Sequence, residues 1–269
     1  MSSQLFKSLH QGPGILLLAN AWDAGSARLI ESSGAKAIAT TSAGLAWSRG
    51  YADGNLLRED KLIDAIADMA RVTSVPLTVD FEAGYSDDPR RVAKLVARVL
   101  AVGVAGINIE DGGGSPDLLC RKIAAIREQA AHAGTDLYIN ARTDVYLRGI
   151  ATGEAATEET IRRGSLYRAA GCDGLFVPGL ANIDAIGAIT AAVKSTPLNI
   201  MAVPNLPSID ALQKHGVRRL SAGSAIAQAA LGCAGRHARG FLAGNVDDMF
   251  LEAAEYGVMN KLFASAALE

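Results

Sequence analysis

PLTVDFEAGYSDDP, residues 76–89, joins a short apolar run to two acids, Asp80 and Glu82, which a glycine follows at position 84. Alternate residues of a β-strand point to the same face, so both carboxylates are expected on one face where a buried strand ends. Like charges at that spacing repel each other, so a positive group is expected beside them. The stretch therefore predicts a buried strand whose carboxyl end carries an acidic pair with a cationic partner.

Seven further apolar runs resemble this one. Together they predict eight strands, at residues 15–20, 36–41, 76–81, 105–110, 136–142, 173–178, 197–203 and 217–222. The runs are expected to be buried on both faces without alternation, which is typical of parallel strands covered by helices. The segments between them have apolar residues at three-to-four spacing, and several end in glycine, the usual helix stop.

Eight strand and helix units predict an α/β fold, a closed (β/α)8 barrel, with a doubly wound open sheet as the alternative. No linker or low-complexity tract divides the sequence, so residues 1–269 are expected to form a single domain. A helical extension is expected over about residues 240–269. Its apolar face must be buried on its own barrel or on a neighbour, which favours an oligomer.

The composition excludes several classes of protein. Hydrophobic residues at 49% and charged residues at 20% describe a soluble globular chain, and the net charge of −2 argues against nucleic acid or an anionic membrane as a partner. Three cysteines without metal-ligand spacing suit a reducing compartment. The sequence shows no secretory signal or membrane-length apolar stretch, so a cytoplasmic protein is expected. The four histidines, including His10, are expected at the surface.

Polar side chains gather at the carboxyl ends of the predicted strands, where the active site of such a barrel lies. The ends of the third to fifth strands carry Asp80, Glu82, Asn108, Glu110, Asp111, Asn140, Arg142 and Asp144. Oxygen ligands of this kind suit Mg2+, which keeps several waters and takes one or two carboxylates directly. Arg142 would then bind a substrate carboxylate through a bidentate contact. The alternative is structural: the acids cap the following helices or pair with Arg142.

Longer motifs surround these strand ends. They are NAWDAGSARLIESSGAKAIATTSAGLAWSRGYADG (20–54), VDFEAGY (79–85), INIEDG (107–112), ARTDVYL (141–147) and GCDGLFVPGL (171–180). From about residue 15 to about 225 the chain resembles the isocitrate lyase/phosphoenolpyruvate mutase superfamily. The resemblance implies an α/β barrel whose final helix is exchanged between subunits of a homodimer or homotetramer. It also implies Mg2+-dependent cleavage or formation of C–C or P–C bonds next to an α-keto acid.

The resemblance also assigns roles by position. Asp80 matches the direct metal ligand, while Glu82 and Glu110 match acids that hold metal-bound waters; Mg2+ is the expected ion, with Mn2+ as the alternative. Asp53 and Arg142 match catalytic residues, and Arg142 also matches the substrate-binding arginine. The remaining substrate-binding expectations are Ser42, Ala43 and Gly44, which match the carboxylate-gripping segment, the weaker match Asn199, and Trp47, which either walls the pocket or simply packs.

The sequence departs from the family pattern after the fourth strand, where it reads IEDGGGSPDLLCRKI (109–123). The Cys-Gly-His of isocitrate and methylisocitrate lyases is absent, and a structural role is favoured for Cys120 over a nucleophilic one. Residues 112–116 are either a gating loop or a shortened connection. Pro178 replaces the histidine of the mutases. A C–C lyase or decarboxylase acting on a small keto- or hydroxy-carboxylate is therefore expected, with a phosphonate P–C enzyme and a non-catalytic keto-acid-binding barrel as alternatives.

Overall fold

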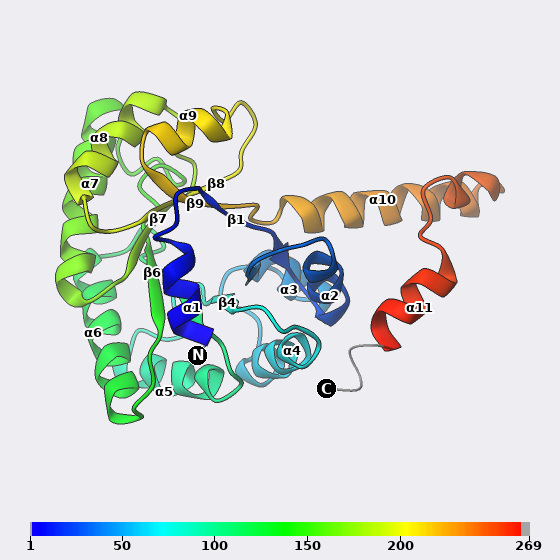
Figure 1. The fold of residues 1–269 in the computed structure, drawn as a ribbon, viewed down its shortest axis with the longest axis horizontal. Helices are drawn as coiled ribbons and strands as arrows, with labels where there is room; N and C mark the ends of the chain where they lie inside the picture. Colours follow the sequence, from blue (N-terminus) through cyan, green and yellow to red (C-terminus); the bar gives the residue numbers. More distant parts are fainter. Residues whose placement is uncertain (1, 265–269) are drawn as a thin grey trace.

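Nine parallel strands form one continuous sheet in the computed structural model, which describes residues 2–264. Their order is β1-β9-β8-β7-β6-β5-β4-β3-β2, and helices surround them (Figure 1). The strands are β1 (Leu16–Leu18), β2 (Asn20–Ala21), β3 (Ile38–Thr40), β4 (Leu77–Asp80), β5 (Gly106–Glu110), β6 (Tyr138–Arg142), β7 (Gly174–Val177), β8 (Leu198–Met201) and β9 (Val217–Ser221). This arrangement confirms the predicted α/β barrel.

From β2 to β9, one or two helices separate each strand from the next. The helices are α1 (Ser2–Leu9), α2 (Ala24–Ser32), α3 (Ser42–Ser48), α4 (Glu59–Val72), α5 (Pro89–Leu100), α6 (Pro116–His132), α7 (Gly153–Ala170), α8 (Ile183–Val193), α9 (Ile209–Lys214), α10 (Ala225–Leu242), η1 (Asp247–Phe250) and α11 (Tyr256–Ala264). Local sequence sets their ends: Asp88 caps α5 by accepting from the Arg90 amide at 2.9 Å, and Gly171 ends α7 with a φ of 109°.

The first predicted strand is divided into two short strands that close the barrel. β1 pairs with β9 and β2 pairs with β3, and the Ala19 carbonyl between them accepts from the Ala39 amide at 3.2 Å. A strand at the seam of a barrel must pair with neighbours on both sides, and the tilt of barrel strands shifts that pairing along its length. The division is therefore the closure of the barrel and not a break in the fold.

The inner face of the barrel differs from the expected apolar pattern. Most strand residues are buried, as expected, although Leu17 of β1 is 51% exposed and β9 alternates buried with half-buried residues. Six buried strand residues with hydrogen-bonded neighbours are polar: Asn20, Asn108, Asn140, Asn199, Arg219 and Ser221. Ile107 and Ile109, which alternate with Asn108, belong to the main apolar core instead. Several of these residues bond one another: Asn140 and Arg219 donate to Asn108 Oδ1, and the Ser221 hydroxyl donates to Asn199 Oδ1. Asn140 Oδ1 and Arg219 Nη1 have no hydrogen-bond partner among the described residues.

Helix α1 packs against the amino ends of the strands, opposite the carboxyl ends that were expected to carry the site. Phe6 is buried there against Ala37, Ala39 and Ala105, which lie at or next to the starts of β3 and β5. His10 follows α1 and is only 2% exposed, so its expected surface position is wrong. The reason is that the α1 segment packs on the barrel and carries the imidazole inside with it.

The C-terminal extension leaves the barrel. Figure 1 shows α10 projecting away from it and α11 turning back, and α11 contacts α2 of the same chain. Exposed apolar side chains run along this segment: Leu231, Phe241, Leu242, Phe250, Leu251 and Tyr256. Residues 240–264 of the predicted extension are described and residues 265–269 lie outside the described part of the chain, so exchange between subunits stays a prediction.

Within residues 2–264, no helix has the length and apolar character that crossing a membrane requires.

Candidate active site

A cavity of about 230 Å³ opens at the carboxyl ends of the strands. It is lined by Asn20, Thr41, Ser42, Ala43, Asp53, Asp80, Asn108, Arg142, Leu147, Phe176, Met201, Ser221, Gly223 and Ser224. Five of the residues expected from the sequence therefore meet there, namely Ser42, Ala43, Asp53, Asp80 and Arg142. A larger hollow of about 600 Å³, beside Arg58 and Arg91, contains none of the site residues expected from the sequence.

Asp80 lies at the end of β4 and is fixed by the neighbouring strand. Its amide donates to Thr40 Oγ1 at 2.8 Å, and its Oδ2 accepts from the Ser42 amide at 3.3 Å. Burial raises the pKa of Asp80, and the nearby Arg142 charge only partly offsets that rise. The side chain is thus a preorganised acid in a site that disfavours its own negative charge.

Arg142, at the end of β6, lies between two carboxylates. Its Nη1 is 2.7 Å from Glu110 Oε2, and Asp144 accepts from its Nε at 2.7 Å and its Nη2 at 3.2 Å. Burial lowers the pKa of Arg142, but Glu110, Asp80 and Asp144 outweigh that effect and raise it above its ordinary value. The guanidinium is therefore permanently charged and held in one orientation toward the cavity.

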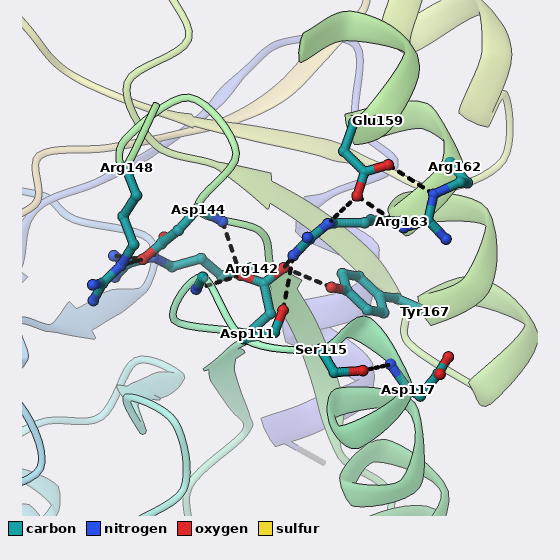
Figure 2. Close-up of polar contacts among 12 residues, drawn as sticks. Asp111, Ser115, Asp117, Arg142, Asp144, Arg148, Glu159, Arg162, Arg163 and Tyr167 are labelled. Carbon is teal, nitrogen blue, oxygen red and sulfur yellow. Dashed lines mark hydrogen bonds and ion pairs between the residues drawn. The ribbon is translucent and has the colours of Figure 1, made fainter. Parts of the chain in front are cut away.

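A buried network supports the loops that follow β5 and β6 (Figure 2). Asp111 Oδ2 accepts from the Tyr167 hydroxyl at 2.6 Å and from Arg163 Nη1 at 2.8 Å, while its Oδ1 accepts from the Asp144 amide at 3.0 Å. Glu159 in turn accepts from Arg163 Nε at 2.7 Å. Helix α7 thereby fixes the loop that presents Asp144 to Arg142. Sequence inspection missed Arg163 and Tyr167, because residues within a long helix carry no local sign of contact with a strand end.

Two of the three acids expected at the metal lie beside the cavity without lining it. Glu82 accepts hydrogen bonds from the Asn55 amide and, at 2.8 Å, from the Tyr85 hydroxyl. Glu110 pairs with Arg142, and burial raises the pKa of Glu110 to about 8. Asp80 alone of the three opens onto the cavity.

The other expected substrate-binding residues are placed differently. Asn199 lies inside the barrel, where its Oδ1 accepts from the Ser221 hydroxyl at 2.8 Å. Gly44 packs so closely that a Cβ would lie 2.8 Å from the Thr41 Cγ2 and 3.0 Å from the Ala227 Cβ, and its amide donates to Thr41 Oγ1 at 3.5 Å. Trp47 is 36% exposed on α3 and does not line the cavity. None of these three residues lines the cavity.

The cavity carries a set of oxygen donors that a divalent cation could use. Among residues 2–264, no group of three or more acid, histidine or cysteine side chains is placed to hold a metal ion. The cavity offers oxygen donors, including Asp80, Asp53 and Ser42, and burial raises the pKa of Asp80, Glu82 and Glu110. Burial and, to a smaller extent, neighbouring carboxylates disfavour the negative charges of these acids. A hard cation that takes few protein ligands and several waters would stabilise those charges and fits this site.

The segment after β5 is a short connection. The Gly114 amide donates to the Asp111 carbonyl at 2.7 Å, and the Gly114 carbonyl accepts from Arg163 at 3.3 Å. Helix α6 begins at Pro116, so Cys120 lies inside it, partly buried. Burial raises the pKa of the Cys120 thiol, which disfavours the thiolate that a nucleophile requires. This geometry favours a shortened connection over a gating loop at residues 112–116. It also favours a structural role for Cys120 over a nucleophilic one.

Known proteins resemble the chain over most of its length. The family model of phosphoenolpyruvate phosphomutase matches residues 6–242. An uncharacterised protein of Mycobacterium tuberculosis is 37% identical over 239 residues, which cover 87% of each chain. The oxaloacetate decarboxylase of Paraburkholderia xenovorans is 31% identical over 200 residues, covering 70% of this chain and 64% of that enzyme.

Solved structures share the architecture. A Burkholderia cenocepacia protein provisionally described as a lyase/mutase superposes with a TM-score of 0.89 at 34% identity, covering 98% of this chain and 95% of that one. Phosphonopyruvate hydrolase, solved with oxalate and Mg2+, superposes with a TM-score of 0.84 at 22% identity, covering 98% of this chain and 95% of its own, a likeness of fold. The expected resemblance is thereby confirmed: the chain belongs to the phosphoenolpyruvate phosphomutase family, within the isocitrate lyase/phosphoenolpyruvate mutase superfamily of lyases and mutases.

Proposed function

We propose that the chain is a Mg2+-dependent enzyme that cleaves a carbon–carbon bond, or releases CO2, next to the keto group of a small α-keto or 2-hydroxy di- or tricarboxylate. The observation that carries the proposal is the meeting of Asp80, Asp53, Ser42 and Arg142 in one cavity. A cavity of about 230 Å³ is smaller than the pockets of drug-sized ligands, which span roughly 300–1,000 Å³, and so suits a small metabolite.

The protein's own groups are arranged to bind an acidic substrate. Arg142 is held by Glu110 and Asp144 and presents its guanidinium to the cavity, where it binds a substrate carboxylate. Ser42 and Ala43 line the same cavity and orient a second carboxylate of the substrate. Because these groups are fixed before the substrate arrives, little reorganisation is needed during the reaction.

Asp80 would hold the cation directly, and Glu82 and Glu110 would do so through water. When bound, Mg2+ supplies a Lewis acid that stabilises the charge developing on the keto oxygen as the neighbouring bond breaks. Asp53 enters the cavity from the loop after α3 and is placed to exchange a proton with the substrate. Phe176 and Leu147 limit the access of water to the reacting carbon.

Similarity to an oxaloacetate decarboxylase over 70% of the chain supports an oxaloacetate-like substrate. A phosphonate P–C enzyme is the second candidate, because a Burkholderia cenocepacia protein 37% identical to the chain is provisionally described as a phosphonomutase. A keto-acid-binding barrel without catalysis is the third.

We also propose a homodimer or homotetramer in the cytoplasm, in which the exposed apolar side chains of α10 and η1 are buried. Light scattering after gel filtration tests the assembly.

The test is a panel of oxaloacetate, 2-methylisocitrate and phosphonopyruvate, assayed for pyruvate with and without Mg2+. Turnover of a carboxylate substrate that stops with a chelator and falls at least about 100-fold in Asp80→Ala supports the proposal. Asp68→Ala, which removes an exposed acid on α4, is the matched control and keeps full activity. Phosphate release from phosphonopyruvate supports the second candidate instead. Absence of turnover together with a keto-acid-induced rise in melting temperature supports the third.

A further inference from the structure

Three residues tie the loop that carries Asp53 to the loop that follows β4. The Asn55 amide donates to Glu82 Oε2, the Tyr85 hydroxyl donates to Glu82 Oε1 at 2.8 Å, and the Tyr85 amide donates to Asn55 Oδ1 at 3.2 Å. The three bonds form a closed ring of interactions, here called the latch. The latch joins residues 49–58, between α3 and α4, to residues 81–88, between β4 and α5.

The backbone of every latch residue is left-handed. The φ angles are 60° at Asn55, 48° at Glu82 and 61° at Tyr85, and among the described residues only Asn205, at 63°, is a further non-glycine residue of this kind. Such a conformation is unfavourable for Glu and Tyr, and persists only where the surroundings determine it strongly. Backbone strain is thus concentrated at one point beside the cavity, as is common at functional sites.

The latch is also buried at its centre. Glu82 is 5% exposed and makes no ion pair with a described residue, so its carboxylate depends on the latch for its partners. Its carbonyl accepts from the Glu110 amide at 2.9 Å, and the Tyr85 ring meets the Phe81 ring edge to face at 5.6 Å. Each carboxylate oxygen can accept two hydrogen bonds, so each Glu82 oxygen keeps the capacity to accept one further donor.

On the loop after α3, the segment between Tyr51 and Leu57 is held mainly by the latch. Residues 52–56 are exposed, and Leu57 is buried again at 4% exposure. Asp53 lies in the exposed part and still lines the cavity. Among the hydrogen bonds of residues 2–264, only those of Asn55 join residues 52–56 to the barrel through a side chain.

We propose that Asn55 and Tyr85 are positioning residues, which act through Glu82 to hold the 49–58 loop in the arrangement that places Asp53 at the cavity. Neither residue touches the substrate. The kinetic part of this inference rests on the proposed function, whereas the structural part does not.

Hydrogen exchange of the amides in residues 50–57 tests the structural part in the full-length protein. Tyr85→Phe keeps the ring against Phe81 and removes one bond to a carboxylate, so we expect loop exchange to rise about tenfold or more. Asn55→Gly keeps the left-handed backbone and the amide donor but removes the acceptor for Tyr85, and should raise exchange as well. Tyr51→Phe and Asn205→Gly are the matched controls, and they should leave loop exchange unchanged.

A double-mutant cycle tests the kinetic part with whichever keto acid is turned over. Tyr85→Phe should lower kcat/KM about tenfold in the parent enzyme but by less than about twofold in an Asp53→Ala background, because the latch acts through Asp53. Unchanged loop exchange in Tyr85→Phe would overturn the latch even in an active enzyme. Equal losses in both backgrounds would overturn its action through Asp53. Failure to find any substrate would count against the proposed function alone, since loop exchange does not depend on it.

Discussion

His10 offers a direct test of how the amino end of the barrel is built. Its ring stacks on Tyr138 with centroids 4.2 Å apart and meets Phe6 edge to face at 4.8 Å. Its Nδ1 lies 2.8 Å from the Phe6 carbonyl, while its Nε2 has no partner among the described residues. Burial, together with the nearby positive charge of Arg219, lowers the pKa of His10 to about 3. The imidazole is therefore neutral in the folded protein.

The sign of the pH dependence follows from that shift. An unfolded chain binds a proton at His10 below its ordinary pKa of about 6.5, whereas the folded protein does so only near 3. The contribution of His10 to the free energy of unfolding is therefore fully present above about pH 6.5 and is lost as the pH falls toward 3. Each pH unit in that window removes about 1.4 kcal/mol, so about 2–3 kcal/mol is lost between pH 7 and pH 4.5.

The assay is urea unfolding at a series of pH values, comparing the parent with His10→Gln. Carboxyl groups titrate in both proteins, so the difference between the two free energies of unfolding isolates His10. His10→Gln is expected to be less stable at pH 7, with a deficit that shrinks by about 2–3 kcal/mol by pH 4.5. His132→Gln, on the exposed end of α6, is the control and should run parallel to the parent. A parallel profile for His10→Gln as well would refute the burial of His10.

Two further predictions concern the site and the barrel interior. Asp144→Asn weakens two hydrogen bonds to Arg142, each worth about 1.5–3 kcal/mol, and should lower kcat/KM about 10- to 100-fold, mainly through KM. Arg148→Gln removes the exposed partner of the same carboxylate and should stay within about threefold of the parent; an active Asp144→Asn would contradict the role given to Asp144. Gly174→Ala places a Cβ 2.5 Å from the Tyr138 hydroxyl and 2.7 Å from Asn140 Oδ1, and should cost about 1–3 kcal/mol in urea unfolding. Gly232→Ala, on exposed α10, should be neutral or gain up to about 1 kcal/mol, and equal behaviour of the two variants would contradict the tight interior.

Much of the fold could be predicted because its signals are local. Apolar runs such as 105–110 and 136–142 contain β5 and β6, and the spacing and caps of the intervening segments identify the helices. The division of the first strand could not be predicted, because it depends on which neighbours meet at the barrel seam. The polar inner face was also missed, since Asn140 can donate to Asn108 only once β5 and β6 are paired in register.

The candidate site was predictable to the extent that it lies at strand ends. Asp80 and Arg142 line one cavity because parallel strands present their carboxyl ends to the same side. The strand pattern placed Asp80 and Glu82 on one face, and only the family resemblance gave the two acids different roles. In the structure β4 ends at Asp80 and the left-handed backbone of Glu82 turns its carboxylate to Asn55 and Tyr85.

The sequence by itself determined the barrel, the strand ends that carry chemistry and the family, because each is written in residue type and spacing along the chain. The tertiary structure decided which acids face the cavity, how α7 and Asp144 hold Arg142, and that His10 is buried. Those features depend on contacts between residues far apart in sequence. Their energies come from burial and from charge pairing, and neither exists until the barrel closes.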